Sequence, residues 1–207
     1  MASRFVGAVW PCLLSAILVP FFPCPIFCTP MLKVHRAIGI ALVGAWLSSP
    51  ALPVRAFSEN DLLRLRRTNE CSGCDLSEAD LSGNSFIGAR LVGVNLSKAK
   101  LANTDWSGAD FTGANLEGVD LSGARLFEAK FQATNLIGAT LSGADLTNAN
   151  LFQAFLSGAK LDRAVLFYAN LRNADLTNAD LTGADLTLAE LNGAKLSGAQ
   201  LPPGFRL

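Results

Sequence analysis

The chain has 207 residues, half of them hydrophobic, and its acidic and basic residues are equal in number. This length permits one domain. From Phe57 onward the net charge is −4, from thirteen basic and seventeen acidic residues, and that part of the chain contains no His or Met. The lack of imidazole there excludes ordinary histidine catalysis, a hydrolytic triad and His-based metal ligation.

Residues 1–30 form an apolar extension with two explanations. They are either a membrane-spanning segment or translated sequence upstream of a true start at Met31. Five prolines between Pro11 and Pro30 suit a stable spanning helix poorly, although the length would suffice. The prolines therefore favour the upstream start.

Residues 31–56 have the features of a secretory signal peptide. They begin with a basic stretch, continue with an apolar run from 37 to 47, and end in small residues typical of a cleavage site. We expect cleavage after Ala56, so the mature chain would begin at Phe57.

Residues 57–70 are expected to close the first end of the following repeat as a short capping helix. Ser58 is placed to cap the helix, with Asp61 three residues later. A repeat array leaves its apolar interior and backbone edge open at its ends. The leucines expected to cover that interior are Leu62, Leu63 and Leu65. Three arginines of the segment should face solvent, and so small a cluster is weak support for a nucleic-acid site.

Cys71 and Cys74 are the cysteines that follow the predicted cleavage site. Both fall on positions of the repeat that should point inward, so they can approach each other. In an oxidising compartment the pair predicts a disulfide that braces the first coil. Two reduced core cysteines, or a redox or zinc site, are the alternatives, although a lone C-x-x-C lacks a second ligand pair.

From Leu76 to Leu201 a large apolar residue recurs at every fifth position, twenty-six times without a break. The residue two places earlier is small at nearly every repeat, and every glycine of this region stands two places after an apolar centre. An α-helix would scatter such centres around its surface, and a continuous strand would place them on alternating faces. The pattern instead predicts short extended pieces joined by corners, where glycine tolerates the bend, with all centres pointing toward one axis.

The run ADLTNADLTGADLTLAEL repeats the unit A-(D/N)-L-x-x and resembles the pentapeptide-repeat family across roughly residues 71–201. The resemblance implies an all-β fold, a right-handed quadrilateral parallel β-helix with four repeats in each coil. On that geometry the array forms roughly six and a half coils, about 31 Å long at about 4.8 Å per coil.

Stacking the repeats twenty residues apart gives four internal columns, two of which are leucine throughout. Asn84 and Thr104 are expected to place polar atoms inside, where they need partners. The aromatic centres should stack in pairs one coil apart, Phe86 with Trp106 and Phe111 with Phe131.

Residues 202–207 are expected to form a C-terminal cap. Pro202 and Pro203 stop the repeat, because proline cannot donate to a backbone ladder. Phe205 is then placed to fold over the last coil.

Residues just before each centre are expected to point outward and to stack in columns. Some pentapeptide-repeat proteins are DNA mimics that protect topoisomerases, and a phosphate mimic needs runs of one sign. Charges here alternate instead, as in the column Asp80, Lys100, Asp120, Thr140, Lys160 and Asp180. The alternation argues for pairing between coils and against an acidic rod.

Six large apolar residues occupy sites expected to face outward. An exposed apolar patch of this kind can mark a surface for a protein partner or a dimer mate, whereas side chains after a centre also lie along the wall and cover its corners. Both interpretations stay open. The six candidates are Phe127, Phe152, Phe155, Val165, Phe167 and Tyr168.

Together these features favour a non-enzymatic, exported structural or protein-interaction module. Outward Asp and Ser recur because the repeat requires them, so no catalytic, cofactor or metal site stands out. Similarity to exported members from cyanobacteria and the thylakoid lumen implies the lumen or the periplasm. Membrane contact would come only from an uncleaved N-terminal segment, and the partner would be an unknown protein or a second copy rather than nucleic acid. The alternative is a DNA-mimic regulator of topoisomerase (gyrase), which requires retention inside the cell.

Overall fold

The structure is a computed structural model that describes residues 57–206. The chain divides into two units, Met1–Ser48 and Ser49–Leu207, and the described residues belong to the second. The expected apolar extension at 1–30 and signal peptide at 31–56 lie outside the described residues. Within 57–206, no helix is both long and apolar enough to cross a membrane.

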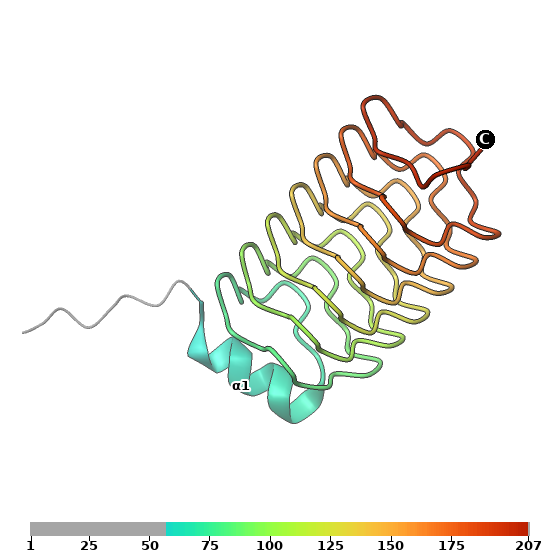
Figure 1. Ribbon diagram of the computed structural model, residues 1–207. Helices are drawn as coiled ribbons and strands as arrows, with labels where there is room; N and C mark the ends of the chain where they lie inside the picture. Colours follow the sequence, from blue (N-terminus) through green and yellow to red (C-terminus); the bar gives the residue numbers. More distant parts are fainter. Residues whose placement is uncertain (1–56, 207) are drawn as a thin grey trace, which may run out of the picture. The chain divides into compact units, whose positions relative to one another are not determined.

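A solenoid of stacked coils makes up most of the described chain (Figure 1). Parallel bridges join each bridge residue to the one twenty positions later, from Glu70–Arg90 to Asp180–Gln200. The bridges fall in four columns five residues apart, so each coil has four sides. A turn follows every bridge, which leaves one bridge residue per side and no longer strand among residues 57–206. The parallel pairing agrees with the expected β-helix, but its regular strand content is smaller than that term suggests.

Hydrogen bonds within and between coils satisfy the backbone of each repeat. Within one repeat the Ala79 N–H donates to the Leu76 carbonyl at 3.1 Å, which closes a turn. Between coils the Leu76 N–H donates to the Asn95 carbonyl at 2.8 Å, and the Asn95 N–H donates back to the Cys74 carbonyl at 2.9 Å. Because buried peptide groups need partners, this pattern satisfies the peptide groups that surround the narrow interior.

The corners share one backbone geometry, and this geometry explains which residue types recur at two positions of the repeat. The residue two places after the centre has a positive φ, 69° at Gly83 and 55° at Asn103 one coil later, and glycine and asparagine adopt this conformation most readily. The residue before the centre is often Asp or Asn because its side chain accepts from the N–H two residues on. Asp75 accepts from the Ser77 N–H in this way at 3.1 Å.

The core contains the predicted inward columns, with Leu76 to Leu181 almost completely buried at every leucine centre. The aromatic centres pair as expected across one coil. The rings of Phe86 and Trp106 stack at 4.5 Å, and those of Phe111 and Phe131 stack at 5.1 Å. Stacked and edge-on aromatic pairs contribute about 0.5–1.5 kcal/mol beyond their burial.

Three polar side chains near these aromatic rings differ in their burial and hydrogen bonding. Thr104 is buried, and its hydroxyl donates to the Leu101 carbonyl, as expected of a polar group inside. The expectation for Asn84 was wrong. Asn84 is exposed, because its amide turns back along the wall to donate to the Leu81 carbonyl at 2.8 Å. The indole nitrogen of Trp106 is buried without a hydrogen-bond partner.

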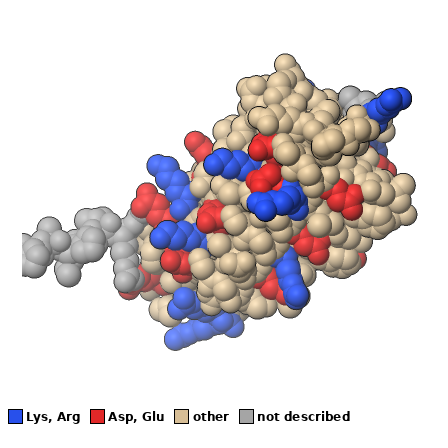
Figure 2. All heavy atoms as spheres, in the orientation of Figure 1, with Lys and Arg blue, Asp and Glu red and all other residues tan. Residues whose placement is uncertain are grey.

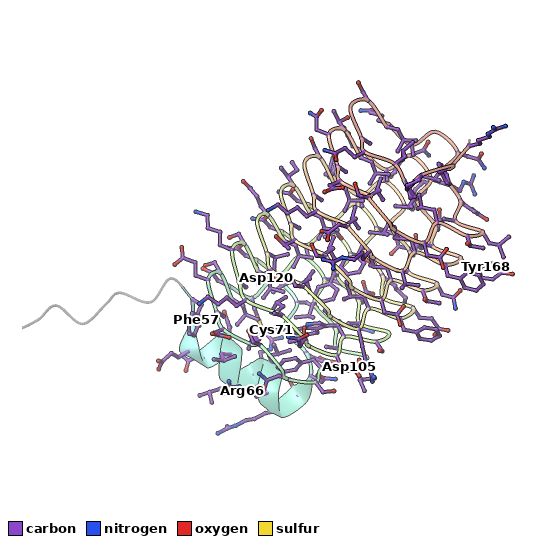
Figure 3. All side chains as sticks on the ribbon, viewed as in Figure 1. Phe57, Arg66, Cys71, Asp105, Asp120 and Tyr168 are labelled. Atoms are coloured by element: carbon purple, nitrogen blue, oxygen red, sulfur yellow. A yellow bond between two sulfur atoms is a disulfide. The ribbon has the colours of Figure 1, made fainter. Side chains whose placement is uncertain are left out.

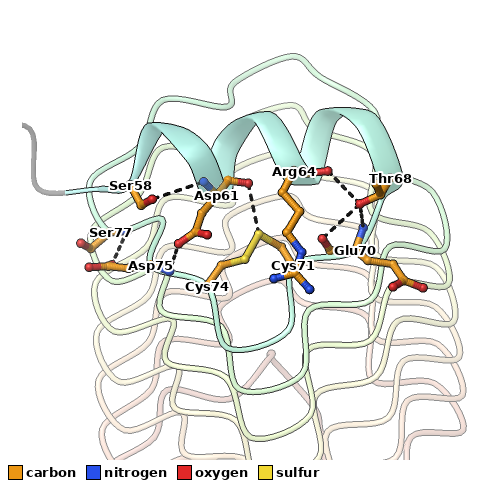
Figure 4. Close-up of a disulfide and its surroundings, with 9 residues drawn as sticks. All are labelled: Ser58, Asp61, Arg64, Thr68, Glu70, Cys71, Cys74, Asp75 and Ser77. Atoms are coloured by element: carbon orange, nitrogen blue, oxygen red, sulfur yellow. Dashed lines mark hydrogen bonds between the residues drawn. A yellow bond between two sulfur atoms is a disulfide. The ribbon is translucent and has the colours of Figure 1, made fainter.

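Helix α1, Glu59–Thr68, covers the N-terminal end of the solenoid (Figures 1 and 4). Ser58 is its N-cap and accepts from the Asp61 N–H at 3.3 Å, as predicted. Leu65 is buried against the first coil and Leu62 packs there partly buried. Leu63 does not cover the coil as predicted. It is 48% exposed, because successive helical positions point about 100° apart and only one side of α1 faces the core.

A disulfide joins Cys71 and Cys74 directly beneath α1 (Figure 4). The Cys71 sulfur lies 3.3 Å from the carbonyl oxygen of Asp61. The Asp61 carboxylate accepts from the Asp75 N–H at 3.1 Å, and the Ser58 N–H donates to the Asp75 carbonyl at 3.1 Å. The helix is therefore tied to the first coil by a sulfur contact, by one side-chain hydrogen bond and by one backbone hydrogen bond.

The C-terminal end is closed less completely. Residues 202–206 cross it, and Phe205 packs partly buried against the core. The inward residues of the last coil, Leu191, Leu196 and Leu201, are partly buried, whereas those of the middle coils are fully buried. Two shallow cavities of about 290 and 320 Å³ flank Phe205.

Candidate interaction surface

The structure places the six candidate apolar residues on two separate surfaces of the solenoid. Val165 bridges Asp145 and Asp185, whereas Phe155 bridges Asn135 and Asp175. These bridge columns are two apart among four, so Val165 and Phe155 lie on opposite sides. Phe127, Phe167 and Tyr168 follow the side of Val165 into the next corner, and Phe152 lies at the corner before Phe155.

The surface around Tyr168 has a compact apolar centre. We define the Tyr168 panel as the outward residues of segments 145–150, 165–170 and 185–190, which are successive coils of the same side and corner. Tyr168 is 55% exposed, and Leu188, one coil further, is 57% exposed. The Phe167 and Tyr168 rings meet edge to face at 4.6 Å. In Figure 3 the labelled Tyr168 side chain projects outward from the wall.

Tyr168 and Leu188 occupy backbone positions that do not suit large side chains. Their φ angles are 57° and 59°, at the corner site where most repeats have glycine or asparagine. A left-handed conformation costs a residue with a Cβ about 1–2 kcal/mol. Neither side chain recovers this energy by burial, since both are more than half exposed. Two unfavourable residues therefore display apolar groups to solvent at adjacent coils.

Charges in the Tyr168 panel have one sign. The three segments contain Asp145, Asp185 and Glu190 and no Lys or Arg. Asp145 and Asp185 lie one coil on either side of Val165, and each accepts from the N–H two residues later, at 3.0 and 2.9 Å. Hydrogen bonds from the Thr187 side chain and backbone lower the pKa of the Asp185 carboxyl below its usual value of 3.8, so this group is ionised at neutral pH.

Elsewhere the two signs are interspersed. Ion pairs across coils join Arg125 to Asp105 at 3.9 Å and Lys195 to Asp175 at 3.5 Å. The face shown in Figure 2 carries acidic and basic side chains side by side rather than a field of one sign. The predicted stacking of outward charges is thus present in the columns, although exposed pairs of this kind contribute only about 0–1 kcal/mol each.

The second surface combines Phe152 and Phe155 with a ladder of amides. Asn135 donates to Asn115 at 3.1 Å, Asn115 to Asn95 at 3.3 Å, and Asn95 to Asp75 at 3.0 Å. Phe155 forms the next bridge of this column, with Asn135, and is 49% exposed. The amides of this ladder therefore hydrogen-bond to one another across successive coils.

Within residues 57–206, no group of three or more His, Cys, Asp or Glu side chains is placed to hold a metal ion.

Comparison with known families identifies the repeat. The model of pentapeptide repeats matches in eight copies, over residues 70–97, 89–126, 129–166 and 169–202, which together make up more than half of the chain. The chain belongs to the pentapeptide-repeat family. The resemblance inferred from the sequence is confirmed.

Solved pentapeptide-repeat structures provide three further comparisons. A protein of the Arabidopsis thaliana thylakoid lumen is 28% identical, with 54% of this chain and 68% of that one covered and a TM-score of 0.38. A protein of the cyanobacterium Cyanothece is 30% identical, with 69% and 97% covered and a TM-score of 0.35. QnrB1, a plasmid-mediated fluoroquinolone resistance protein, is 22% identical, with 64% and 81% covered and a TM-score of 0.33. Among curated proteins there is no match.

Proposed function

We propose that this pentapeptide-repeat protein is a non-enzymatic interaction module that is exported and binds a protein partner through its outer wall. The coil is taken to be right-handed and quadrilateral, as in the family. The segment at 31–56 supports export, and the thylakoid lumen or the periplasm is the compartment. Retention of the N-terminal segment would anchor the module to the membrane.

This proposal rests mainly on the exposure of the Tyr168 and Leu188 side chains. Both are large, apolar and exposed, and both stand at corners whose backbone favours glycine or asparagine. What distinguishes Tyr168 and Leu188 is that they place large apolar side chains at this strained corner site without burying them. Polar or charged residues occupy the same site elsewhere, at Glu78, Lys98, Glu128, Gln153 and Arg163. On a rigid wall, exposed aromatic residues are also the residue type that most often anchors a protein interface.

The alternative, a DNA-mimic regulator of gyrase, receives less support. A mimic of the phosphate backbone requires summed negative potential along a rod. Here Arg125 and Lys195 neutralise carboxylates of neighbouring coils. The Tyr168 panel, with Asp145, Asp185 and Glu190, is too short for a duplex-like surface.

Cell fractionation followed by cross-linking of the full chain tests the proposal. We expect the processed protein in the lumen or periplasm, with one or more proteins cross-linked to it. Phe167→Ser combined with Tyr168→Asn should abolish that cross-link, because it removes the aromatic pair from the Tyr168 panel. Phe152→Ser, on the other surface, is the matched control and should preserve the cross-link.

Three results would contradict the proposal. A cytosolic protein would remove the case for export. Cross-linking that is equal in the aromatic variant and the wild type would reject the Tyr168 panel as the contact surface. Inhibition of gyrase supercoiling by the purified protein would favour the alternative.

A further inference from the structure

We propose that the Tyr168 panel binds an amphipathic protein segment whose apolar residues are flanked by lysine or arginine. This inference rests on the proposed function and adds the chemistry of the partner. It follows from the arrangement of apolar and charged groups within the panel.

The apolar centre defines where such a segment would lie. Val165, Phe167, Tyr168 and Leu188 occupy one side and the following corner over two adjacent coils. Residue Phe127 extends the same corner column two coils away, with Thr147 between them. An apolar row of this kind, parallel to the solenoid axis, fits the apolar stripe of a partner better than a single anchoring side chain.

The rim of the panel sets the charge of the partner. Asp145 and Asp185 stand on both sides of Val165, and Glu190 lies beyond Leu188 along the chain. Each Asp uses one oxygen for the turn N–H, at 3.0 Å for Asp145, and the second oxygen is not used by that bond. Two bases stand beside the panel, and each is paired with another carboxylate. Arg125, one coil from Asp145 in the same column, lies 3.9 Å from Asp105, and Arg163, at the preceding corner, lies 3.0 Å from Asp162. Complementary charge around an apolar centre steers association and selects partners.

The same charges argue against two other occupants. An anionic membrane surface would be repelled by three carboxylates beside the apolar centre. A second copy bound panel to panel by a twofold axis would bring the acidic groups of both copies together, which disfavours that contact. A basic amphipathic segment meets neither obstacle.

A fluorine label reports on the panel directly, because Tyr168 is the one tyrosine of the chain. Protein carrying 3-fluorotyrosine should give a single ¹⁹F resonance from the centre of the panel. The probes are a synthetic Leu/Lys amphipathic peptide and a Leu/Glu peptide of the same pattern. We expect the Leu/Lys peptide to shift the resonance saturably, with weaker binding at higher salt, and the Leu/Glu peptide to leave it unchanged.

Paired variants separate charge from shape. Asp145→Asn with Asp185→Asn removes two charges and keeps an acceptor for the turn, as Asn150 does for the Phe152 N–H at 3.1 Å. We expect this variant to bind the labelled Leu/Lys peptide roughly threefold more weakly or worse. Asp110→Asn with Asp120→Asn makes the same change of net charge elsewhere and should bind like the wild type.

The apolar centre is tested with a backbone-compatible substitution. Leu188→Asn places at φ 59° a residue that the same corner site accepts at Asn148, where φ is 57°. It should weaken binding of the Leu/Lys peptide at least threefold without unfolding the solenoid. Gln153→Asn, at φ 56° on another corner, should have no effect.

The outcomes distinguish this inference from the proposed function. Equal binding of the Leu/Glu peptide, or no ¹⁹F shift with the Leu/Lys peptide, would overturn it. A shift with protein concentration alone would assign the panel to a second copy, and a shift with anionic vesicles would assign it to lipid; either result would replace the inference. If Phe167→Ser with Tyr168→Asn abolishes the native cross-link while Asp145→Asn with Asp185→Asn preserves it, the interaction module stands and the basic partner is rejected.

Discussion

The two ends of this solenoid are closed in different ways. At the N-terminal end α1 lies across the first coil, Leu65 is buried, and the Cys71–Cys74 disulfide holds the coil beneath the helix. At the C-terminal end residues 202–206 cross the last coil, and Phe205 covers it only in part. The same repeat thus begins in a sealed end and finishes in a partly open one.

This difference shows where stability is concentrated in a repeat array. Each coil is supported by its neighbours, so a terminal coil has support on one side and depends on its cap for the other. A ten-residue helix such as α1 is marginal in isolation, and its stability comes from docking. We therefore expect the molecule to open first at its C-terminal end, and the following changes test that order.

The largest effect should come from a matched pair of core substitutions in one leucine column. Leu76→Ala, in the first coil, should lower the free energy of unfolding by about 2–5 kcal/mol, because the sealed end cannot collapse into the cavity. Leu196→Ala, in the same column of the last coil, should lower it by only about 1–2 kcal/mol, since Leu196 is partly exposed already. Chemical denaturation measures both values.

Leu136→Ala is the control for this pair, because Leu136 is fully buried in the middle of the same column. Its loss should equal that of Leu76→Ala if the helix seals the first coil as well as a neighbouring coil would. Equal losses at Leu76 and Leu196 would contradict the difference between the ends.

Removal of the disulfide should have the next largest effect. Cys71→Ala with Cys74→Ala should cost about 2 kcal/mol, because the closed loop is short. The loss should be local. Hydrogen exchange is expected to accelerate in α1 and in the first coil and to stay unchanged around Leu136, whereas uniform acceleration would show that the bridge supports the whole array.

Removal of the C-terminal aromatic should have a smaller effect. Phe205→Ala should cost about 1 kcal/mol, since the ring is only partly buried, and it should join the two cavities of about 290 and 320 Å³ beside it. Exchange should accelerate in the last coil alone. A loss as large as that of Leu76→Ala would mean that the short tail seals its end as firmly as α1.

Most of this fold could be predicted from the sequence, because each five-residue repeat contains the residues that determine its own conformation. A five-residue period with a small residue two places before each Leu determines which side chains point inward. The corner has a left-handed backbone conformation, which explains why glycine recurs two places after each centre. The departures occur where single residues override the pattern. Asn84 lies outside because its amide bonds to the wall, and Leu63 is exposed because a helix presents one face.

The candidate surface was only partly predictable, since exposure and grouping depend on the coil. All six apolar residues were identified from the sequence, but their division between opposite sides follows from twenty-residue coils, as Val165 and Phe155 show. Leu188 was missed, although a large apolar residue at a site that most repeats fill with Gly or Asn was a signal in the sequence. The positive φ of Leu188, 59°, explains why a large residue is unusual at that site.

The smallest effect should be a dependence on pH that is the same at both ends. Hydrogen bonds from Ser82 lower the pKa of Asp80 in the first coil, and hydrogen bonds from Thr187 lower the pKa of Asp185 in the last coil, each from its usual 3.8. A carboxyl with a lowered pKa in the folded state stabilises the fold above its unfolded pKa, and the stabilisation is lost as pH falls through the folded pKa.

The free energy of unfolding should therefore be level above about pH 5 and decline below about pH 4. Asp80→Asn and Asp185→Asn should each flatten this decline by a similar amount. Each should lower stability at neutral pH by no more than the wild type loses when that carboxyl is protonated, because Asn keeps an acceptor for the turn N–H but carries no charge. Denaturation curves at a series of pH values check this. A flattening at one end only would mean that these turns depend on the closure of the solenoid, whereas equal flattening would show that each corner is stabilised locally and that the ends differ only in how their cores are covered.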